Sequence, residues 1–434
     1  MQTVDVAVVG GGVAGLIAAH DTARMGLATS LFEAAPAFGG RAQTRILEGF
    51  HFNLGPHALY TNGHFRKTLS ALDVKFAGHR LHLTNAVALW EGQRHPLPLG
   101  LETMQRATPL DDLDRSQLAK IFGDVAQGAY DFAGQPLTAF TASLRPRVAK
   151  MIEALIRVVT YVHAPALIDG KAALDQLRLA FGGVLYVDGG WGELVAGLAA
   201  SATSAGAKLQ TRSSVAKVTR REAGWVLYGP GLEEHLASSV ILAVAPQVAA
   251  TIVEQSHELP AIANRTKPIK LMCLDLGLSK LPSSEATWAL GIDQPTYFAV
   301  HSTVAKLTSG DGAIAHVACY LAPDESPSAT HFEALEKLTD FLQPGWQDVE
   351  IRRQRLAGMV VAHDFPSYVA RGQRGPIAVR DAPGLFLAGD WVGAEGMLSD
   401  ASAASARAAA RAVGEYCEQS GNAVSRLRLT RRGD

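Results

Sequence analysis

The fold of this chain is decided by residues 4–33, which read VDVAVVGGGVAGLIAAHDTARMGLATSLFE. The run at 4–9 is apolar and β-branched, which predicts a strand, and residues 16–27 have a helical pattern. A glycine turn lies between them, and residues 28–32 predict a second strand that ends at Glu33. A strand, a glycine turn and a helix in direct succession are typical of a dinucleotide-binding unit.

The glycines of this turn have separate roles. Gly10 allows the tight backbone turn, Gly12 lets a pyrophosphate approach the main chain, and Gly15 lets the helix pack closely on the strand. The helix N-terminus then offers free N–H groups and partial positive charge to the phosphates. Glu33 is placed to accept hydrogen bonds from an unmodified ribose, and it would repel a 2′-phosphate. A purely structural tight turn is the alternative interpretation.

Composition places the chain among globular proteins with a large core. Its 434 residues are 48% hydrophobic and 19% charged, which excludes a disordered chain, and the length favours two domains. A net charge of −1 excludes a strongly basic protein, so no nucleic acid is expected as a partner. No run of about eighteen apolar residues occurs, so we expect no membrane-spanning helix. The first residues also lack the pattern of an export signal, which predicts a cytoplasmic protein.

The cysteines give no sign of a metal centre. Cys273, Cys319 and Cys417 are isolated and form no CxxC pair, which argues against a zinc site, a redox dithiol or a disulfide framework. We therefore expect no metal, and reduced structural cysteines agree with a cytoplasmic location.

A second glycine-rich segment follows Glu33 at residues 34–41, which read AAPAFGGR. Gly39 and Gly40 let the backbone pass close to a second phosphate or a flavin ring, and Arg41 offers fixed donors to it. With the first glycine turn and Glu33, this segment resembles the amino-terminal FAD signature of the flavin amine oxidase, protoporphyrinogen oxidase and phytoene desaturase superfamily. The resemblance implies FAD as the cofactor.

A carboxy-terminal segment extends the resemblance. Residues 384–391 read GLFLAGDW and are similar to the second FAD motif of the superfamily, in which a strand ends in an A-G-D turn at Gly389 and Asp390. The resemblance implies that Asp390 bonds the ribitol or a phosphate-bridging water. It also implies that the amides of Met397 and Leu398 face the pyrimidine end of the ring, where a helix N-terminus stabilises an anionic reduced flavin.

One further residue is assigned to the adenine. Residues 186–191 read YVDGGW and resemble the Y-x-x-G-G turn of the superfamily, which precedes a helix and a strand. By that motif Val215 packs beside the adenine, and a core valine is the alternative. Monoamine oxidases attach flavin through a cysteine that has no counterpart here, because Cys417 falls at the end of the last helix. FAD is therefore expected to be noncovalent.

The resemblance implies an α/β fold, with a Rossmann-like FAD-binding domain of the GR2 flavoprotein type and an α+β substrate-binding domain. Both domains are expected to be discontinuous. The predicted FAD-binding domain comprises residues 1–75, 184–262 and 355–420. The predicted substrate domain comprises residues 76–183 and 263–354, with a helical insertion at 108–180. Residues 421–434 are predicted to be a basic flexible tail.

His57 is the first candidate for the chemistry. It ends residues 52–57, FNLGPH, which resemble the D-x-G-P-H segment of the desaturase branch, with Asn53 where an acid is common. His57 is either a catalytic base near the flavin or a structural histidine in a loop.

Two more candidates lie later in the chain. Lys270 matches the lysine that holds a water at flavin N5 in polyamine-oxidase-like relatives, with Lys267 as the competing position and an exposed lysine as the alternative. Tyr368 lies in a segment that resembles the P-x-Y element of the family, which implies a place in the wall of the substrate cavity.

Residues 152–168 are apolar but too short and interrupted to span a bilayer. Three interpretations remain open for them: a wall of an apolar tunnel, a contact with a membrane surface, and a buried core helix.

The flavin face indicates the substrate class. Amine oxidases have an aromatic pair there, but residues 392–405 contain no tyrosine, and Trp391 lies too close to the turn. We therefore expect an FAD-dependent oxidoreductase that removes hydride from a bulky apolar substrate, an isoprenoid or carotenoid-like molecule, as in the phytoene desaturase-like branch. The alternatives are a flavin amine oxidase that uses oxygen, a protoporphyrinogen oxidase-like enzyme, and a flavin-containing binding protein without redox activity.

Overall fold

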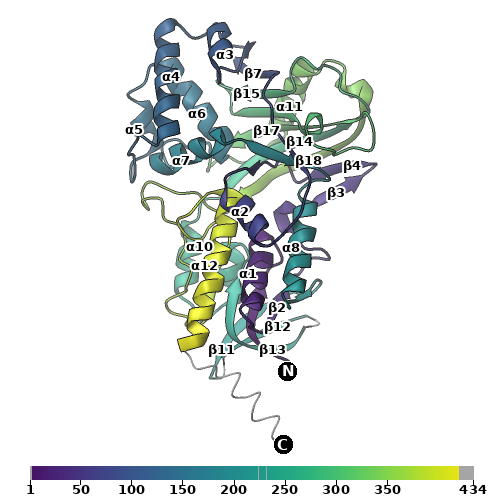
Figure 1. The fold of residues 1–434 in the computed structure, drawn as a ribbon, viewed down its shortest axis with the longest axis vertical. Helices are drawn as coiled ribbons and strands as arrows, with labels where there is room; N and C mark the ends of the chain where they lie inside the picture. The colour runs from purple at the N-terminus through teal and green to yellow at the C-terminus, as the bar shows by residue number, and fades with distance from the viewer. Residues whose placement is uncertain (1, 223, 231, 420–434) are drawn as a thin grey trace, which may run out of the picture.

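The structure of the chain is a computed structural model that describes residues 2–222, 224–230 and 232–419. The predicted basic tail at 421–434 lies outside the described residues. Figure 1 shows two regions, a lower one that holds the first strand and the last helix and an upper one that holds the segments 86–181 and 269–362. Each region is built around one seven-stranded sheet.

The lower sheet is Rossmann-like. Its strands are β1 (Gln2–Val9), β2 (Thr29–Phe32), β10 (Lys208–Gln210), β11 (Lys217–Arg221), β12 (Gly224–Gly229), β13 (Leu232–Leu242) and β19 (Leu385–Leu387). Their order is β10-β2-β1-β13-β12-β11, and β19 pairs with β13. The pairs of β1 with β2 and β13, of β2 with β10, and of β13 with β19 are parallel, whereas β11 and β12 add an antiparallel edge.

Helices cover both faces of this sheet, which explains why β1 ends in four consecutive apolar residues, Val6 to Val9. Val6 and Val8 belong to the core beneath α1 (Val13–Arg24), α8 (Gly192–Ser204) and α12 (Leu398–Gln419). Ala7 and Val9 belong to the opposite core, which is closed by α9 (Pro246–Ile252) and α10 (Glu258–Arg265).

The upper sheet is mainly antiparallel. Its strands are β7 (Ala86–Trp90), β8 (Gln93–Pro96), β14 (Ile269–Leu278), β15 (Trp288–Gly291), β16 (Thr296–Val300), β17 (Ala313–Leu321) and β18 (Glu350–Ala362). Their order is β18-β14-β17-β16-β15-β7-β8, and the one parallel pair among these strands is β7 with β15. The two sheets confirm the predicted α/β class with a Rossmann-like sheet and a second, largely antiparallel sheet.

The remaining elements connect or cover the sheets. Short strands form two small sheets, one of β3 (Thr44–Leu47) and β4 (Phe50–Asn53) and one of β5 (Leu59–Tyr60), β9 (Val184–Val187) and β6 (Gly78–Arg80). The helices of the upper region are α3 (Leu101–Arg106), α4 (Asp112–Gln127), α5 (Leu137–Thr141), α6 (Pro146–Thr160), α7 (Gly170–Phe181) and α11 (Ala329–Leu342), and α2 (His64–Ala71) lies beside α12. The predicted domain boundary at 355 falls inside β18.

The segment 152–168 is not one helix. Helix α6 ends at Thr160, and Tyr161 has a φ of +63°, which turns the chain away from the helix axis. Within α6, Ile152 and Leu155 are buried in the core of the upper region. Leu155 and Val158 also line a cavity, so this helix is both a core helix and a cavity wall.

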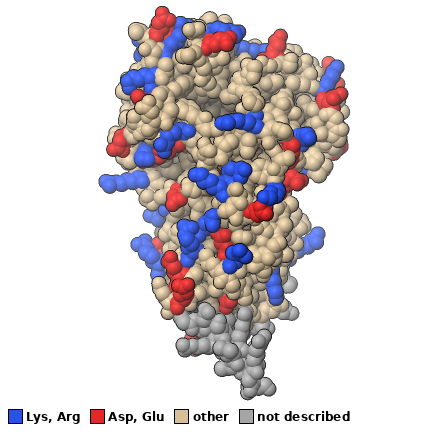
Figure 2. Space-filling view, viewed as in Figure 1, with Lys and Arg blue, Asp and Glu red and all other residues tan. Residues whose placement is uncertain are grey.

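The surface carries both signs of charge. Figure 2 shows lysine and arginine side chains interspersed with aspartate and glutamate over the visible face, as expected for a net charge of −1. No helix among the described residues has the length and apolar character needed to cross a membrane.

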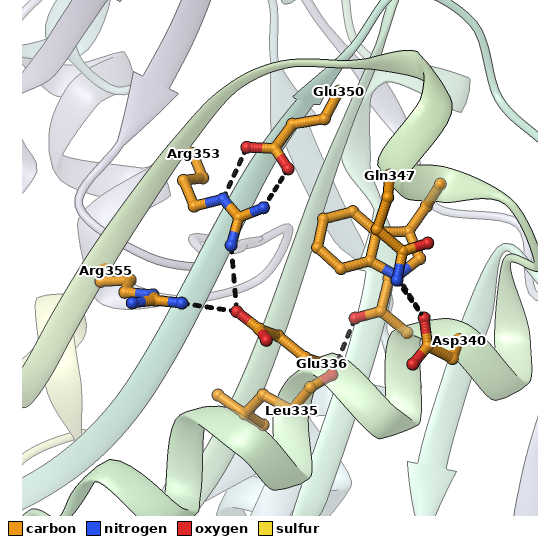
Figure 3. A network of polar contacts seen from close by, with 9 residues as sticks. Leu335, Glu336, Asp340, Gln347, Glu350, Arg353 and Arg355 are labelled. Atoms are coloured by element: carbon orange, nitrogen blue, oxygen red, sulfur yellow. Dashed lines mark hydrogen bonds and ion pairs between the residues drawn. The ribbon is translucent and has the colours of Figure 1, made fainter.

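Helix α11 is fixed to the upper sheet by a buried leucine and by an ionic network. Leu335 is fully buried against β14 and β17. Glu336, the next residue, accepts hydrogen bonds from Arg353 Nη1 at 3.0 Å and Arg355 Nη2 at 2.5 Å (Figure 3). Arg353 also pairs with Glu350 on its own strand.

The adjacent residues Leu335 and Glu336 allow the stability contributions of apolar burial and of a surface ion pair to be compared. Leu335→Ala should lower the free energy of unfolding by about 2–5 kcal/mol, because it leaves a cavity in a closed core. Glu336→Gln should cost only about 0–1 kcal/mol, because its ion pairs are partly solvated. Urea unfolding followed by circular dichroism measures both, and equal losses would contradict this division.

Candidate functional site

One cavity of about 1340 Å³ joins the two regions of the chain. At one end it is lined by the glycine turn after β1, by Glu33 and by the start of α12. At the other end it is lined by apolar side chains of α4, α6, α7 and the upper sheet. The structure therefore places both predicted cofactor motifs against a single space.

Two glycines of the first turn are required by the packing of the protein itself. A Cβ atom at Gly15 would lie 1.8 Å from the carbonyl oxygen of Gly10, so α1 could not approach β1. Gly10 has a φ of +103°, and a Cβ there would lie 2.5 Å from the carbonyl oxygen of Ala243. These positions have the roles predicted for the tight turn and for helix packing.

Gly12 is different, because nothing in the protein excludes a side chain there. Its φ is −76°, and the nearest atom to an added Cβ would be the carbonyl oxygen of Gly39 at 4.0 Å. Gly12 lines the cavity, as do Gly39 and Gly40, which have φ values of +117° and +54°. The space that a side chain at Gly12 would occupy is therefore open to a ligand that approaches the N-terminus of α1.

Glu33 lies at the carboxyl end of β2, as predicted. Its Oε2 atom accepts a hydrogen bond from the Gly11 amide at 2.6 Å, and its Oε1 atom accepts one from the Ala35 amide at 2.7 Å. These two bonds fix the carboxylate in the cavity wall. An ionised carboxylate has about four acceptor sites, so it can also receive a ribose diol.

An ion pair joins the two predicted FAD motifs. Arg41 Nη1 lies 2.5 Å from Asp390 Oδ2 and donates to the carbonyl oxygen of Val361 at 2.7 Å. The His363 amide donates to the other Asp390 oxygen at 3.2 Å. The hydrogen bonds found for Arg41 among the described residues use Nη1 alone, so the remaining guanidinium donors are available to a phosphate.

The second motif ends at the start of α12. Gly389 has a φ of +146°, and its amide donates to Ser405 Oγ at 2.9 Å, which holds the turn against the helix. Leu398 lines the cavity and has a φ of +56°. Met397 is buried in the upper core and is not among the described residues that line the cavity. Of the two predicted positions, only Leu398 is therefore placed at the cavity.

A buried carboxyl group stands behind this helix start. Asp400, in the first turn of α12, accepts a hydrogen bond from the Phe65 amide at 2.7 Å through Oδ1, and its Oδ2 has no partner among the described residues. Burial raises the pKa of Asp400 to about 6. It ties α2 to α12 beside the cavity.

His57 lies in the cavity wall and is held by backbone groups. Its Nδ1 atom is 3.0 Å from the Gly55 carbonyl oxygen, and its Nε2 atom is 3.2 Å from the Arg41 carbonyl oxygen. Its ring packs against Trp191 at 4.7 Å between centroids, and burial lowers its pKa. With both ring nitrogens beside carbonyls, His57 supports the backbone at Arg41, which favours the structural interpretation.

Lys270 is not at the cavity, contrary to the prediction. Side chains alternate along β14, so Leu271 and Cys273 face the core beneath the insertion helices. Lys270 shares the other face with Met272 and Leu274, which pack in the core beneath α11. Lys267, the competing position, is exposed and outside the cavity wall.

Two other predicted residues are also not among the described cavity-lining residues. Tyr368 is half-buried in the loop after β18, where its amide donates to the Leu167 carbonyl oxygen at 3.1 Å. Val215 precedes β11 and packs with Phe32 in a hydrophobic core, which supports its alternative interpretation as a core valine. The sequence motifs identified the segments that contain Tyr368 and Val215, but they did not predict which way these side chains point.

Several lining residues were missed from the sequence. Trp191 follows the quoted YVDGG turn, and its indole Nε1 is buried without a hydrogen-bond partner among the described residues. Tyr60 and Tyr297 come from segments without any motif, whereas Tyr161 lies in the segment 152–168, for which a tunnel wall was one of the three interpretations. Trp391 also lines the cavity, and its indole donates to the Val244 carbonyl oxygen at 3.0 Å.

These residues fit FAD. An open approach at Gly12, a fixed carboxylate at Glu33 and free donors on Arg41 surround one space. When bound, FAD supplies a two-electron acceptor for hydride, and the protein supplies its binding and orientation.

Gly12 gives the sharpest test of this fit. Gly12→Ala should leave the unfolding midpoint of the FAD-free protein nearly unchanged, because the added methyl meets no protein atom. FAD binding should weaken at least tenfold, since the methyl group occupies the phosphate approach. Isothermal titration with FAD measures the loss.

Gly123→Ala is the matched control, because a Cβ at Gly123 in α4 also meets nothing within 4 Å. It should bind FAD like the unchanged protein. Unimpaired FAD binding by Gly12→Ala would contradict the site.

Comparison with known proteins agrees with this geometry. An oxidoreductase from Methanosarcina mazei has a similar structure, with a TM-score of 0.74 and 15% identity over 94% of this chain and 99% of that chain. Putrescine oxidase bound to putrescine has a TM-score of 0.72 and 14% identity over 95% of this chain and 99% of that chain. At these identities the likeness shows a shared fold.

Sequence comparison gives the family. A Rattus norvegicus protein, pyridine nucleotide-disulfide oxidoreductase domain-containing protein 2, is 26% identical over 406 residues, which cover 75% of this chain and 68% of that protein. The family model of flavin containing amine oxidoreductases matches residues 13–270, which is more than half of the chain. The chain therefore belongs to the flavin containing amine oxidoreductases, a family of FAD-dependent enzymes.

Proposed function

We propose that this FAD-dependent oxidoreductase removes hydride from a bulky apolar substrate, in a dehydrogenation or desaturation like that of the phytoene desaturase-like branch. The observation that carries the proposal is the wall of the cavity beyond the cofactor motifs. It is formed largely by aliphatic and aromatic side chains, which include Leu81, Leu83, Leu155, Val158, Leu177, Phe181 and Trp288. An apolar wall of this kind binds by excluding water.

Charge at the cavity also favours an apolar substrate over a cation. Among the described lining residues the acidic ones are Glu33 and Asp390, and both belong to the cofactor motifs. The wall beyond them carries Arg80 and His82. A protonated amine would therefore find no carboxylate to pair with there.

In this reaction the residues of the protein bind the substrate, orient it and exclude water. Hydride transfer depends mainly on alignment of the donor carbon, so a dry wall that fixes the substrate is sufficient for much of the rate. The hydroxyl groups of Tyr60 and Tyr161 donate to the carbonyl oxygens of Val159 and Pro56 at 2.7 and 3.1 Å. With their hydroxyls paired, these rings present mainly apolar surface to the substrate.

We also propose noncovalent FAD. Cys273, Cys319 and Cys417 are free, and none of them is among the described residues that line the cavity. Free cysteines also support a cytoplasmic location. The mixed surface charge supports the expectation that nucleic acid is not a partner.

An amine oxidase activity is the second candidate, because aromatic rings do line the cavity. Tyr186, Trp288 and Tyr297 lie together, with 5.6 Å between the ring centroids of Trp288 and Tyr297. The negative faces of such rings attract a cationic amine.

The two candidates are separated by reduction of the bound flavin without oxygen. We expect squalene or phytoene in detergent to bleach the visible flavin band at least tenfold faster than putrescine or benzylamine. The reverse order, followed by recovery in oxygen, would replace the proposal with the amine oxidase. Denaturation should release the flavin into the filtrate if it is noncovalent.

Two variants on α6 test whether the apolar substrate that bleaches the flavin binds in this cavity. Val158→Trp should slow bleaching by the apolar substrate more than tenfold, because it fills the wall, and should leave the flavin spectrum unchanged. Lys150→Trp adds a similar ring on the exposed side of the same helix and should have no effect on bleaching.

Contact with a membrane surface is proposed for the mouth of the cavity. Leu99 and Phe181 line the cavity and are 38% and 40% exposed, and Leu101 beside them at the start of α3 is 80% exposed. Apolar side chains at an opening allow a lipid-dissolved substrate to enter without crossing water.

Sedimentation with neutral phosphatidylcholine vesicles tests this contact. We expect Leu101→Asp to reduce the bound fraction at least threefold, because a charge replaces the most exposed apolar group. Leu113→Asp, at another exposed leucine on α4, is the control for a general effect of charge. Equal binding by Leu101→Asp and the unchanged chain would refute the membrane contact.

A further inference from the structure

A chain of buried polar side chains leads from the cavity into the upper sheet. Tyr297 of β16 lines the cavity, and its hydroxyl lies 3.4 Å from His301 Nε2. The His301 ring packs edge-on against the His316 ring at 4.4 Å between centroids, and because His316 Nε2 has no hydrogen-bond partner among the described residues, this contact is not a hydrogen bond. His316 Nδ1 lies 2.6 Å from Asp275 Oδ1. His301 is 1% exposed, and His316 and Asp275 are fully buried.

Asp275 lies at the inner end of this group of buried side chains. It lies directly opposite His316 on β17 and Gln354 on β18, so strand register brings the three side chains together. Gln354 Nε2 donates to Asp275 Oδ2 at 2.9 Å, and the Cys273 thiol donates to Oδ1 at 3.0 Å. The Gly55 amide, two residues before His57, donates to Oδ2 at 3.3 Å.

Stability alone does not account for this cluster. A buried ion pair typically contributes less than a well-packed apolar group of the same size. His316 Nε2 and Gln354 Oε1 have no hydrogen-bond partner among the described residues, and each such atom costs about 1–3 kcal/mol. Because unpaired polar atoms in a closed core lower stability, we infer that this cluster has a functional role.

His301 is neutral before the flavin is reduced, and its Nε2 atom lies beside a hydroxyl group of the cavity wall. Its pKa is held well below the ordinary value, first by burial and then by His316 and His57. A neutral imidazole has one nitrogen free to accept, and the Tyr297 hydroxyl lies beside Nε2. The ionisable groups that face His301 from the surrounding elements are Tyr186, stacked at 3.8 Å, Tyr297, His316 and, more distantly, His57 and Asp275.

We propose that Tyr297 and His301, which lie beside the buried His316–Asp275 pair, form a proton relay that takes up the proton the substrate loses together with its hydride. The inference rests on the flavin-dependent oxidation within the proposed function, but not on the identity of the substrate. An apolar C–H donor and an amine both release one hydride and one proton.

A desaturation breaks two C–H bonds on adjacent carbons and forms a second bond between those carbons. One C–H bond breaks with its electron pair, and the hydride passes to FAD, which is thereby reduced. The adjacent C–H bond breaks, and its electron pair forms the second bond between the two carbons. Its proton moves to the Tyr297 oxygen, while the Tyr297 proton moves to His301 Nε2. The substrate is oxidised by two electrons, and no other reactant is needed.

Reduction itself provides the driving force for the uptake. A reduced flavin adds negative charge to a cavity that excludes water, and negative charge raises the proton affinity of a nearby neutral base. The relay should therefore bind a proton when the flavin is reduced and release it when the flavin is oxidised.

This property can be measured without any substrate. The FAD-loaded protein would be photoreduced without oxygen at about pH 6.5, where an ordinary histidine is half protonated. Proton uptake would be followed with an indicator dye in weak buffer. We expect His301→Gln to take up one proton fewer for each flavin reduced than the unchanged protein. Equal uptake by the two would overturn the relay.

A second histidine of the same sheet serves as the control. His95 on β8 is buried and bonded to Thr108 Oγ1 at 2.9 Å, and it does not line the cavity. His95→Gln should take up as many protons as the unchanged protein. Loss of the proton in this variant as well would also overturn the assignment.

Nuclear magnetic resonance of isotope-labelled histidines in the unchanged protein covers the case in which His301→Gln does not fold. The His301 ring should become protonated on reduction, and a spectrum in which it stays neutral would refute the relay. A protein that takes up the extra proton but is bleached by neither substrate panel would retain the relay and lose the proposed function.

Discussion

The ion pair between Arg41 and Asp390 is the contact on which the arrangement of the site depends. Asp390 is almost fully buried, and Arg41 also donates to the Val361 carbonyl oxygen near the end of β18. One guanidinium thus connects the amino-terminal motif, the carboxy-terminal motif and the upper sheet. Because a buried carboxylate needs a partner, this pairing constrains where the two sheets meet and where the cavity between them opens.

The two ends of the cavity follow different physical rules. At the cofactor end, backbone groups and fixed charges dominate, with Gly12 open to a ligand and Glu33 held by two amides. At the other end, aliphatic side chains and paired tyrosines present a wall that binds by excluding water. A reaction that passes hydride from an apolar molecule to a flavin needs both surfaces in one space.

The buried polar side chains behind Tyr297 give the site a third property, a group that can take up a proton. A dry cavity promotes hydride transfer but offers no water to take a proton, so a base within the wall becomes necessary. His301 meets that need, and the Asp275–His316 pair packs behind it in the sheet that forms the roof of the cavity. Their hydrogen bonds depend on strand register, so the upper sheet contributes chemistry as well as shape.

Local sequence was sufficient for the cofactor end. The strand, turn and helix around Gly10, Gly12 and Gly15 are contiguous, and their backbone demands are met within a few residues, so spacing alone predicted them. Glu33 and Arg41 followed for the same reason, whereas Asp390 was predicted from the resemblance of its A-G-D turn to the second FAD motif of the superfamily. These predictions identified the α/β class and residues that the structure brings to one cavity.

Tertiary structure decided what lies at the substrate end. Lys270 was predicted at the flavin, but strand alternation turns it toward α11, and one residue of register separates the two faces. Tyr297, His301, His316 and Asp275 come from three strands and a turn without a shared motif, so their contact arises only when those strands pair. The sequence by itself determined the local backbone that receives a dinucleotide, because that information is contiguous. The folded sheets alone decided which side chains face the substrate, because side-chain direction is set by long-range pairing.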